Sequence, residues 1–192
     1  MSRYTEDFFR NRVSSITASA AETSLRTASK SVTGVFDIFL SHSFRDARVI
    51  LGIREWLTSQ NLRVYVDWID DPEFDRSAVS AATAARLREQ MGNSRSLIYA
   101  TSRAAKTSRW MPWELGYFDA SKGSSQVSIM RLESSSSNKF VGEEYLGLYK
   151  QIEEVSSGGK LQPYAIRPSG KQAESLRSFS QAAGRYEDLV YR

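Results

Sequence analysis

The stretch Val35-Phe36-Asp37-Ile38-Phe39-Leu40 is a short, mostly apolar run of strand-forming residues, which is typical of a parallel strand buried on both faces. A polar segment, Ser41-His42-Ser43-Phe44-Arg45-Asp46, follows it. From Asp46 to about Ser59 apolar residues recur at helical spacing, and residues 62–68 form a second predicted strand. Strand, helix and strand in this order predict a right-handed crossover between two parallel strands.

The alternation of strands and helices continues beyond this unit. Further strands are predicted over residues 96–100, 126–132 and 162–166, and further helices over residues 77–91, 109–121 and 172–183. Residues 145–154 mix apolar and polar side chains without a clean period. The pattern predicts an α/β domain with a doubly wound, mainly parallel sheet of five strands and a C-terminal helix.

The N-terminal region differs in composition from the rest of the chain. Residues 1–33 are rich in Ser, Thr and Ala, and their apolar side chains recur at broadly helical spacing. We predict an N-terminal helical extension that leads through a Ser/Thr linker into a domain spanning residues 34–192. The sequence leaves open whether this extension packs on the domain, mediates assembly or frays.

Composition excludes several classes of function. The 192 residues include no Cys and one His, which excludes disulfides, thiolate nucleophiles, Cys-based zinc sites and polyhistidine metal centres. The net charge of +4 is spread without a Lys/Arg-rich run, so we expect no nucleic-acid partner. No apolar run approaches the roughly 20 residues of a membrane span, and no hydrophobic signal segment opens the chain. We therefore expect no membrane partner and a cytoplasmic location.

Three loops are expected to meet at one edge of the sheet, because ligands of open parallel sheets bind at the carboxyl ends of the strands. They are the polar segment 41–46, Asp67-Trp68 with the Pro-containing acidic loop 69–76, and the segment 101–114. No G-x-G-x-x-G turn and no phosphate-binding P-loop are present, which disfavours a Rossmann dehydrogenase or a P-loop enzyme. The acidic loop lacks the EF-hand pattern, so we expect no metal site.

The helix predicted over residues 109–121 places one carboxylate among large aromatic rings. Trp110 and Glu114 are four residues apart and share one helical face. Pro112 fits the first turn, where its missing amide hydrogen has no partner, with Thr107 or Ser108 as a cap. Glu114 then lies near the helix N-terminus, where the dipole favours an ionised carboxylate that is suited to stabilising a cation.

Three boxes in this order resemble the Toll/interleukin-1 receptor (TIR) domain. Residues 36–43 with Asp46 are similar to its first box, the loop 69–76 occupies the position of its BB loop, and Trp110-x-x-x-Glu114 is similar to the Trp and catalytic Glu of NAD-cleaving TIR domains. The resemblance covers about residues 35–170 and implies the flavodoxin-like TIR fold. Residues 64–68 and 144–149 look most like short bacterial TIR-only proteins, including those of Thoeris-type anti-phage defence.

The resemblance implies an enzyme that cleaves the nicotinamide–ribose bond of NAD with Glu114 as the catalytic residue. NAD is then a substrate, and no cofactor is expected. Its nicotinamide is a cationic pyridinium that leaves as a neutral ring, so one carboxylate suffices, whereas an ordinary glycosidase uses two because its leaving oxygen must be protonated. Water as the acceptor gives ADP-ribose, and a nitrogen or ribose hydroxyl of the same molecule gives a cyclic product. The sequence does not name the acceptor.

Candidate substrate-binding residues flank Glu114 on the three loops. The set comprises Ser41, His42, Ser43, Asp67, Trp68 and Trp110. Trp68 or Trp110 offers a ring face to a base, although Trp110 is equally suited to a core. Asp67 contacts a ribose or caps a turn. A hydrolase with His42 as the base for Ser41 or Ser43 is disfavoured, because neighbours on one turn rarely aim their side chains at each other.

We therefore predict an NAD glycohydrolase or ADP-ribosyl cyclase of bacterial anti-phage immunity. The resemblance also implies self-association through the loop 69–76 and a downstream nucleotide-sensing effector. A first alternative is a non-catalytic TIR interaction module, which assembles without turning over NAD. A second is a nucleoside deoxyribosyltransferase-like enzyme, which processes free deoxynucleosides and ignores NAD.

Overall fold

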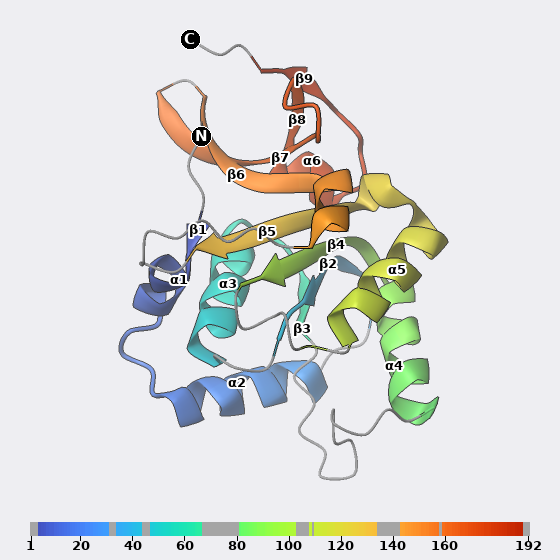
Figure 1. Cartoon of the computed structure of the whole chain (residues 1–192). Helices are drawn as coiled ribbons and strands as arrows, with labels where there is room; N and C mark the ends of the chain where they lie inside the picture. The colour runs from blue at the N-terminus through green and yellow to red at the C-terminus, as the bar shows by residue number, and fades with distance from the viewer. Residues whose placement is uncertain are drawn as a thin grey trace.

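The protein forms one mixed sheet with helices on both faces (Figure 1). The structure is a computed structural model that describes residues 4–30, 34–43, 47–66, 81–102, 108, 110–133, 143–157 and 159–189. Among these residues, nine strands join the sheet in the order β3-β2-β4-β5-β6-β7-β8-β9, with β1 paired to β5. The sheet is therefore larger than the predicted five strands.

Five parallel strands make up the half of the sheet that carries the candidate site. They are β2 (Phe36–Ser41), β3 (Val64–Val66), β4 (Ser94–Thr101), β5 (Val127–Glu133) and β6 (Lys150–Ser157). All neighbours in the row β3-β2-β4-β5-β6 are parallel. Counted along the chain, this is the order 2-1-3-4-5 of flavodoxin-like doubly wound sheets. The predicted α/β fold is confirmed.

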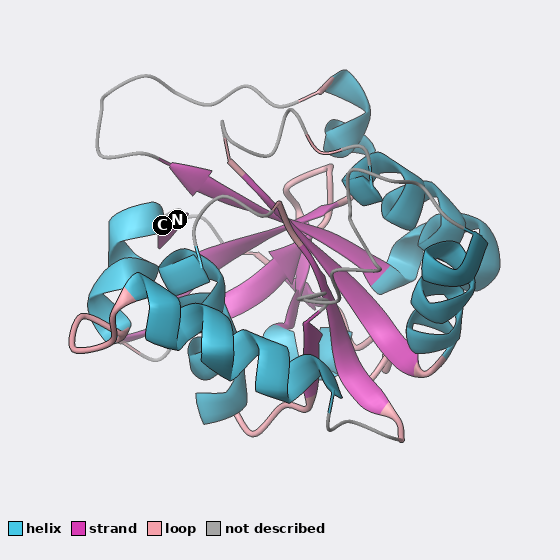
Figure 2. Cartoon of the chain, turned by 90° about the horizontal axis from the view of Figure 1, so that it is seen from below, coloured by secondary structure: helices cyan, strands magenta, loops and turns pink. Residues whose placement is uncertain are grey.

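Helices cover the two faces of this parallel half (Figures 1 and 2). On one face lie α3 (Ala47–Ser59) and the N-terminal helices, and on the other lie α4 (Ala81–Gly92) and α5 (Trp110–Lys122). Successive side chains of β2 point to opposite faces of the sheet, so the strand contributes to the hydrophobic core on each face. Ile38 and Leu40 belong to the cluster under α3, and Phe39 belongs to the cluster under α5. Within the described ranges, no helix combines the length and the hydropathy needed to cross a membrane.

The N-terminal segment packs on α3. β1 (Tyr4–Thr5) pairs with the end of β5, and α1 (Glu6–Arg12) and α2 (Ala18–Lys30) follow it. Phe9 of α1 is fully buried, and its ring meets Trp56 of α3 edge-on with centroids 5.7 Å apart. Residues 18–30 form the second of two helices in the predicted N-terminal extension. Ala21 and Leu25 of this helix are buried in the core, and this packing outweighs the modest helix propensity of Ser and Thr.

A glycine allows this close contact between α1 and α3. A Cβ added to Gly52 would lie 2.1 Å from the carbonyl oxygen of Phe9, which is backbone and cannot rotate away. We expect Gly52→Ala to lower the free energy of unfolding by about 1–3 kcal/mol, as other overpacked sites do, in a urea titration. Gly116→Ala is the matched control, because it lies in α5 with open space around it and should raise stability by up to about 1 kcal/mol. Equal effects of the two substitutions would contradict the contact.

The C-terminal part of the sheet differs from the prediction. The fifth parallel strand is β6, in the stretch without a clean period, whereas β7 (Lys160–Ile166) at the predicted position runs antiparallel to it. The η3 turn of 3-10 helix (Glu144–Leu148) precedes β6, and η2 (Ser124–Gln126) precedes β5. The predicted C-terminal helix over residues 172–183 is present but shorter than predicted. These residues begin with β8 (Gln172–Ser175) and the five-residue α6 (Leu176–Ser180), and β9 (Glu187–Asp188) follows.

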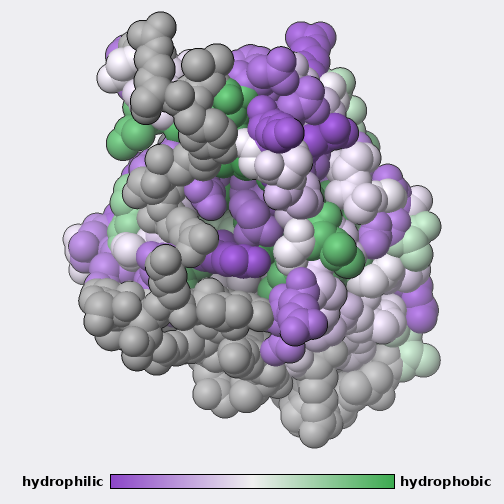
Figure 3. All heavy atoms as spheres, turned by 45° about the horizontal axis from the view of Figure 1, so that its top comes forward, coloured by the Kyte–Doolittle hydropathy of each residue, from purple (hydrophilic) through white to green (hydrophobic). Residues whose placement is uncertain are grey.

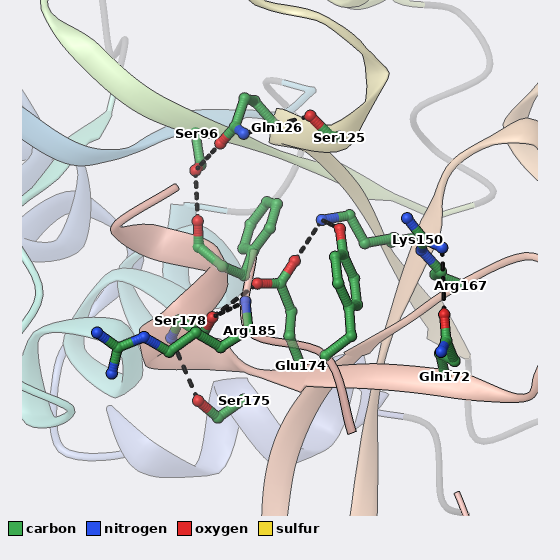
Figure 4. A network of polar contacts seen from close by, with 12 residues as sticks. Ser96, Ser125, Gln126, Lys150, Arg167, Gln172, Glu174, Ser175, Ser178 and Arg185 are labelled. Carbon is green, nitrogen blue, oxygen red and sulfur yellow. Dashed lines mark hydrogen bonds and ion pairs between the residues drawn. The ribbon is translucent and has the colours of Figure 1, made fainter. Parts of the chain in front are cut away.

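A buried ion pair explains why the sequence pattern misleads here (Figure 4). Lys150 Nζ on β6 lies 2.5 Å from Glu174 Oε1 on β8, and both side chains are buried. Ser178 Oγ donates to Glu174 Oε2 at 2.8 Å and accepts from the Arg185 backbone N–H at 3.0 Å. Lys150 also lies 3.3 Å from the Tyr186 hydroxyl. Charged residues thus occupy core positions of two strands, which hides the apolar alternation on which strand prediction depends.

Removing one partner of this ion pair is expected to lower the free energy of unfolding much more than replacing both partners. Glu174→Ala leaves the Lys150 ammonium buried without its counter-ion, and we expect it to lower the free energy of unfolding by about 3–5 kcal/mol. The double substitution Lys150→Met with Glu174→Leu removes both charges and should recover most of the loss. Chemical denaturation of the two variants and the parent measures this. A double variant as unstable as Glu174→Ala would contradict the interpretation.

Candidate active site

The α5 helix presents Glu114 as the sequence predicts. Ser108 caps the helix, because its Oγ accepts the backbone N–H of Met111 at 3.3 Å. Pro112 is the third residue of the helix and lies in its first turn, where no intrahelical partner is lost. Glu114 follows two residues later, close enough to the N-terminus for a favourable interaction with the helix dipole.

Ser41 of β2 contacts Glu114 directly. Ser41 is the last residue of the strand, and alternation places it on the same face as Phe39, under α5. Its Oγ donates a hydrogen bond of 2.5 Å to Glu114 Oε2. Glu114 is 0% exposed, and Ser41 is also buried. The carboxyl end of β2 and the start of α5 therefore meet around one buried carboxylate, as the sheet-edge rule predicts.

Tyr99 of β4 lies beside this pair, although the sequence analysis did not single it out. Its Cα is the register partner of the Ser41 Cα in the parallel β2–β4 ladder. Burial raises the pKa of Tyr99 above its ordinary value, and a hydrogen bond with Tyr145 and the charges of Glu114 and Glu143 add to the rise. The carboxyl ends of neighbouring parallel strands lie side by side. The position of Tyr99, two residues before the end of β4, could therefore have indicated that it lies near Ser41.

Trp110 lies in the core cluster that also contains Tyr99 and Leu146. The Trp110 side chain is 5% exposed, and its ring meets Trp113 edge-on with centroids 5.4 Å apart. In this conformation the ring therefore packs against protein. A role for Trp110 in binding the substrate stays a prediction.

The other predicted binding residues divide into two groups. His42 is 1% exposed, and its Nδ1 lies 3.3 Å from the backbone oxygen of the half-buried Ser43. The Ser41 hydroxyl donates to Glu114, which does not favour the Ser–His hydrolase reading. Asp67 and Trp68 lie outside the described residues, as does the loop 69–76. The roles assigned to all of them remain predictions.

The segment around η3 is tied to the helix that carries Glu114. Tyr149, just after η3, donates a hydrogen bond of 2.8 Å from its hydroxyl to Asp119 Oδ2 of α5. Gln151 Nε2 donates to the backbone oxygens of Leu146 at 3.1 Å and Tyr149 at 3.0 Å. These bonds fix the segment that brings Tyr145 to Tyr99.

The tie between Tyr149 and α5 is expected to depend on pH. Burial, the hydrogen bond to Asp119 and the negative charge of Asp119 raise the pKa of Tyr149 from 10.0 to about 12. A group with a raised folded-state pKa contributes stability that is present below about pH 10 and is lost as the pH rises toward 12. We expect Tyr149→Phe to lower the free energy of unfolding by about 1 kcal/mol at pH 8. The difference from the parent should shrink as the pH rises above 10 and be lost before pH 12 in paired denaturant titrations, and a constant difference would contradict the assignment.

Comparison with known proteins identifies the class to which this fold and site belong. The sheet order and the Glu114 helix are those expected of a TIR-like α/β domain. Residues 39–137, just over half of the chain, match the family model described as "Thoeris protein ThsB, TIR-like domain". The chain belongs to this ThsB TIR-like family.

Two curated proteins are similar in sequence. The chain is 50% identical over 119 residues to a protein of Bacillus cereus (strain MSX-D12) named "Probable 3' cyclic ADP-D-ribose synthase ThsB'", which covers 62% of this chain and 61% of that protein. It is 31% identical over 84 residues to the "Putative cyclic ADP-D-ribose synthase TIR2" of Cytobacillus dafuensis, covering 43% of this chain and 22% of that protein. The matches thus span less than two thirds of either relative.

Proposed function

We propose that the protein cleaves the bond between nicotinamide and ribose in NAD and converts the rest of the molecule into cyclic or linear ADP-ribose. The observation that carries the proposal is the buried carboxylate of Glu114, near the start of α5 and bound by Ser41 at the carboxyl end of a parallel strand. The names of both relatives, which are cyclic ADP-D-ribose synthases, support the same reaction and favour the cyclic product.

The proposed chemistry needs only one carboxylate, that of Glu114. When the bond between the ribose carbon and the pyridinium nitrogen breaks, the electron pair leaves with nicotinamide, which becomes neutral. The ribose is left with oxocarbenium character, and the Glu114 carboxylate stabilises that positive charge electrostatically. A water or hydroxyl acceptor then bonds to the same carbon and releases its proton to solvent, whereas a ring nitrogen acceptor forms the bond with its lone pair. Ser41 acts as a positioning residue that holds the carboxylate in one orientation.

The burial of Glu114 has a consequence for how the enzyme works. A side chain that is 0% exposed cannot touch a dissolved substrate, so part of the surrounding structure moves before NAD reaches it. The proposed enzyme is accordingly slow until an event opens the site. In the proposed biological setting, this event belongs to phage infection, the protein acts in the cytoplasm and self-associates through residues 69–76, and a nucleotide-sensing effector reads the product.

The decisive experiment measures nicotinamide release from NAD by the parent and by Glu114→Gln, with and without forced clustering. We expect Glu114→Gln to lower the rate by at least about 100-fold, the usual effect of removing a group that stabilises transition-state charge. Glu89→Gln, which removes an exposed carboxylate from α4, is the control and should keep the parental rate. Chromatography of the nucleotide product separates a cyclic from a linear product.

Three outcomes would overturn the proposal. A folded Glu114→Gln protein that releases nicotinamide at the parental rate would remove Glu114 from the chemistry. Assembly without NAD turnover under either condition would favour the interaction module. Processing of free deoxynucleosides with no action on NAD would favour a deoxyribosyltransferase-like enzyme.

A further inference from the structure

The η3 segment brings an exposed aromatic ring to the neighbourhood of Glu114. Leu146 anchors η3 in the core cluster that holds Tyr99 and Trp110. The Gln151 side chain fixes it from β6, and the Tyr149 hydroxyl fixes it from α5. The side chain of Tyr145 on this anchored turn is 39% exposed. The segment lies beyond residues 39–137, so the family match does not include it.

Glu114, Tyr99 and Tyr145 form a row that runs from the buried carboxylate to this exposed ring. Ser41 holds Glu114 from β2, and Tyr99 is the register partner of Ser41 on β4. The Tyr99 hydroxyl is close enough to Glu114 to respond to its charge, and it hydrogen-bonds with Tyr145. Glu114 is fully buried, Tyr99 is 4% exposed and Tyr145 reaches the surface. The row therefore leads outward from the proposed catalytic group.

We propose that Tyr145 is a substrate-contact residue whose ring stacks on the nicotinamide of NAD. This inference rests on the proposed function and adds the residue that recognises the leaving group. The bond to be cut joins the nicotinamide to the ribose, so the ring beside Glu114 is the nicotinamide and not the adenine. Trp110, the other aromatic candidate among the described residues, is 5% exposed and already packs against Trp113.

The chemistry of the two rings supports this assignment. The bonds from Tyr149 to α5 and from Gln151 to η3 fix the backbone that carries Tyr145, so little entropy of this segment remains to be lost on binding. Before cleavage the nicotinamide is a cation, which the negative face of a Tyr ring attracts in addition to ordinary stacking. After cleavage the nicotinamide is neutral and the cation–π contribution disappears. Tyr145 thus binds the substrate more tightly than the released product.

The test compares Tyr145→Leu with the parent in nicotinamide release from NAD. We expect KM for NAD to rise about tenfold and kcat to be unchanged or up to about threefold higher, because the attraction to the cationic ring is full in the bound substrate and weakens as the ring becomes neutral in the transition state. Competitive inhibition by N-methylnicotinamide, which carries the cationic ring without the nucleotide, should weaken by a similar factor. Tyr145→Phe retains the ring and should recover most of the affinity.

Leu148→Ala is the matched control, because Leu148 is an exposed apolar residue of the same η3 turn. We expect parental KM for this variant. An unchanged KM in Tyr145→Leu would overturn the inference, as would an equal rise in Leu148→Ala, which would indicate a general disturbance of η3. A fall in kcat at constant KM would overturn it too, because Tyr145 would then act on Glu114 through Tyr99. A parent that releases no nicotinamide, even when clustered, would defeat the proposed function itself and this inference with it.

Discussion

The hydrogen bond from Ser41 to Glu114 is the interaction on which the candidate site depends. A carboxylate without solvent exposure is costly unless its oxygens find donors, and this bond supplies one at 2.5 Å. The two residues are 73 positions apart in the chain, and only the parallel order of β2 and β4 with α5 packed above them brings the two together. The fold thus creates the charge environment before any substrate arrives.

The same arrangement sets stability against activity. Ser41 holds Glu114 within the core, whereas the proposed reaction requires that the carboxylate become accessible to NAD. Functional sites commonly retain such costs, because a site optimised for stability alone would lose its chemistry. In this protein Glu114 lies close to Tyr99, and Tyr99 in turn lies close to Tyr145, whose ring reaches the surface. On this face of the sheet, Tyr99 is the residue that lies between the buried Glu114 and the surface residue Tyr145.

The sequence predicts the parallel half of the fold well, because its elements are apolar and strongly periodic. The strand at 36–41, the helix at 47–59 and the α5 helix appear within a few residues of the predicted bounds, and Ser108 and Pro112 take the expected places at the start of α5. The strand at residues 162–166 was also predicted and corresponds to β7, but β6 and β8 were missed because Lys150 and Glu174 occupy core positions in them, which no pattern of apolar residues can reveal.

The candidate site was predictable in its residues but not in its contacts. The sequence predicts that Ser41 and Glu114 lie at one edge of the sheet, and the structure adds a direct hydrogen bond between them that no sequence pattern indicates. Tyr99 and Tyr145 were not considered as site residues, because their meeting depends on how η3 folds back over α5. Nothing in the spacing of residues 143–149 encodes that return.

The Lys150–Glu174 pair has a further consequence for how the chain finds its strand register. Successive side chains of a strand point to opposite faces, so a slip of β8 by one residue would move Glu174 to the other side of the sheet. Lys150 would then remain in the interior without a counter-ion, at a cost of several kcal/mol. Alternative pairings of the C-terminal strands are penalised in this way even where their apolar contacts are adequate. The two charges therefore select one alignment of the antiparallel strands during folding.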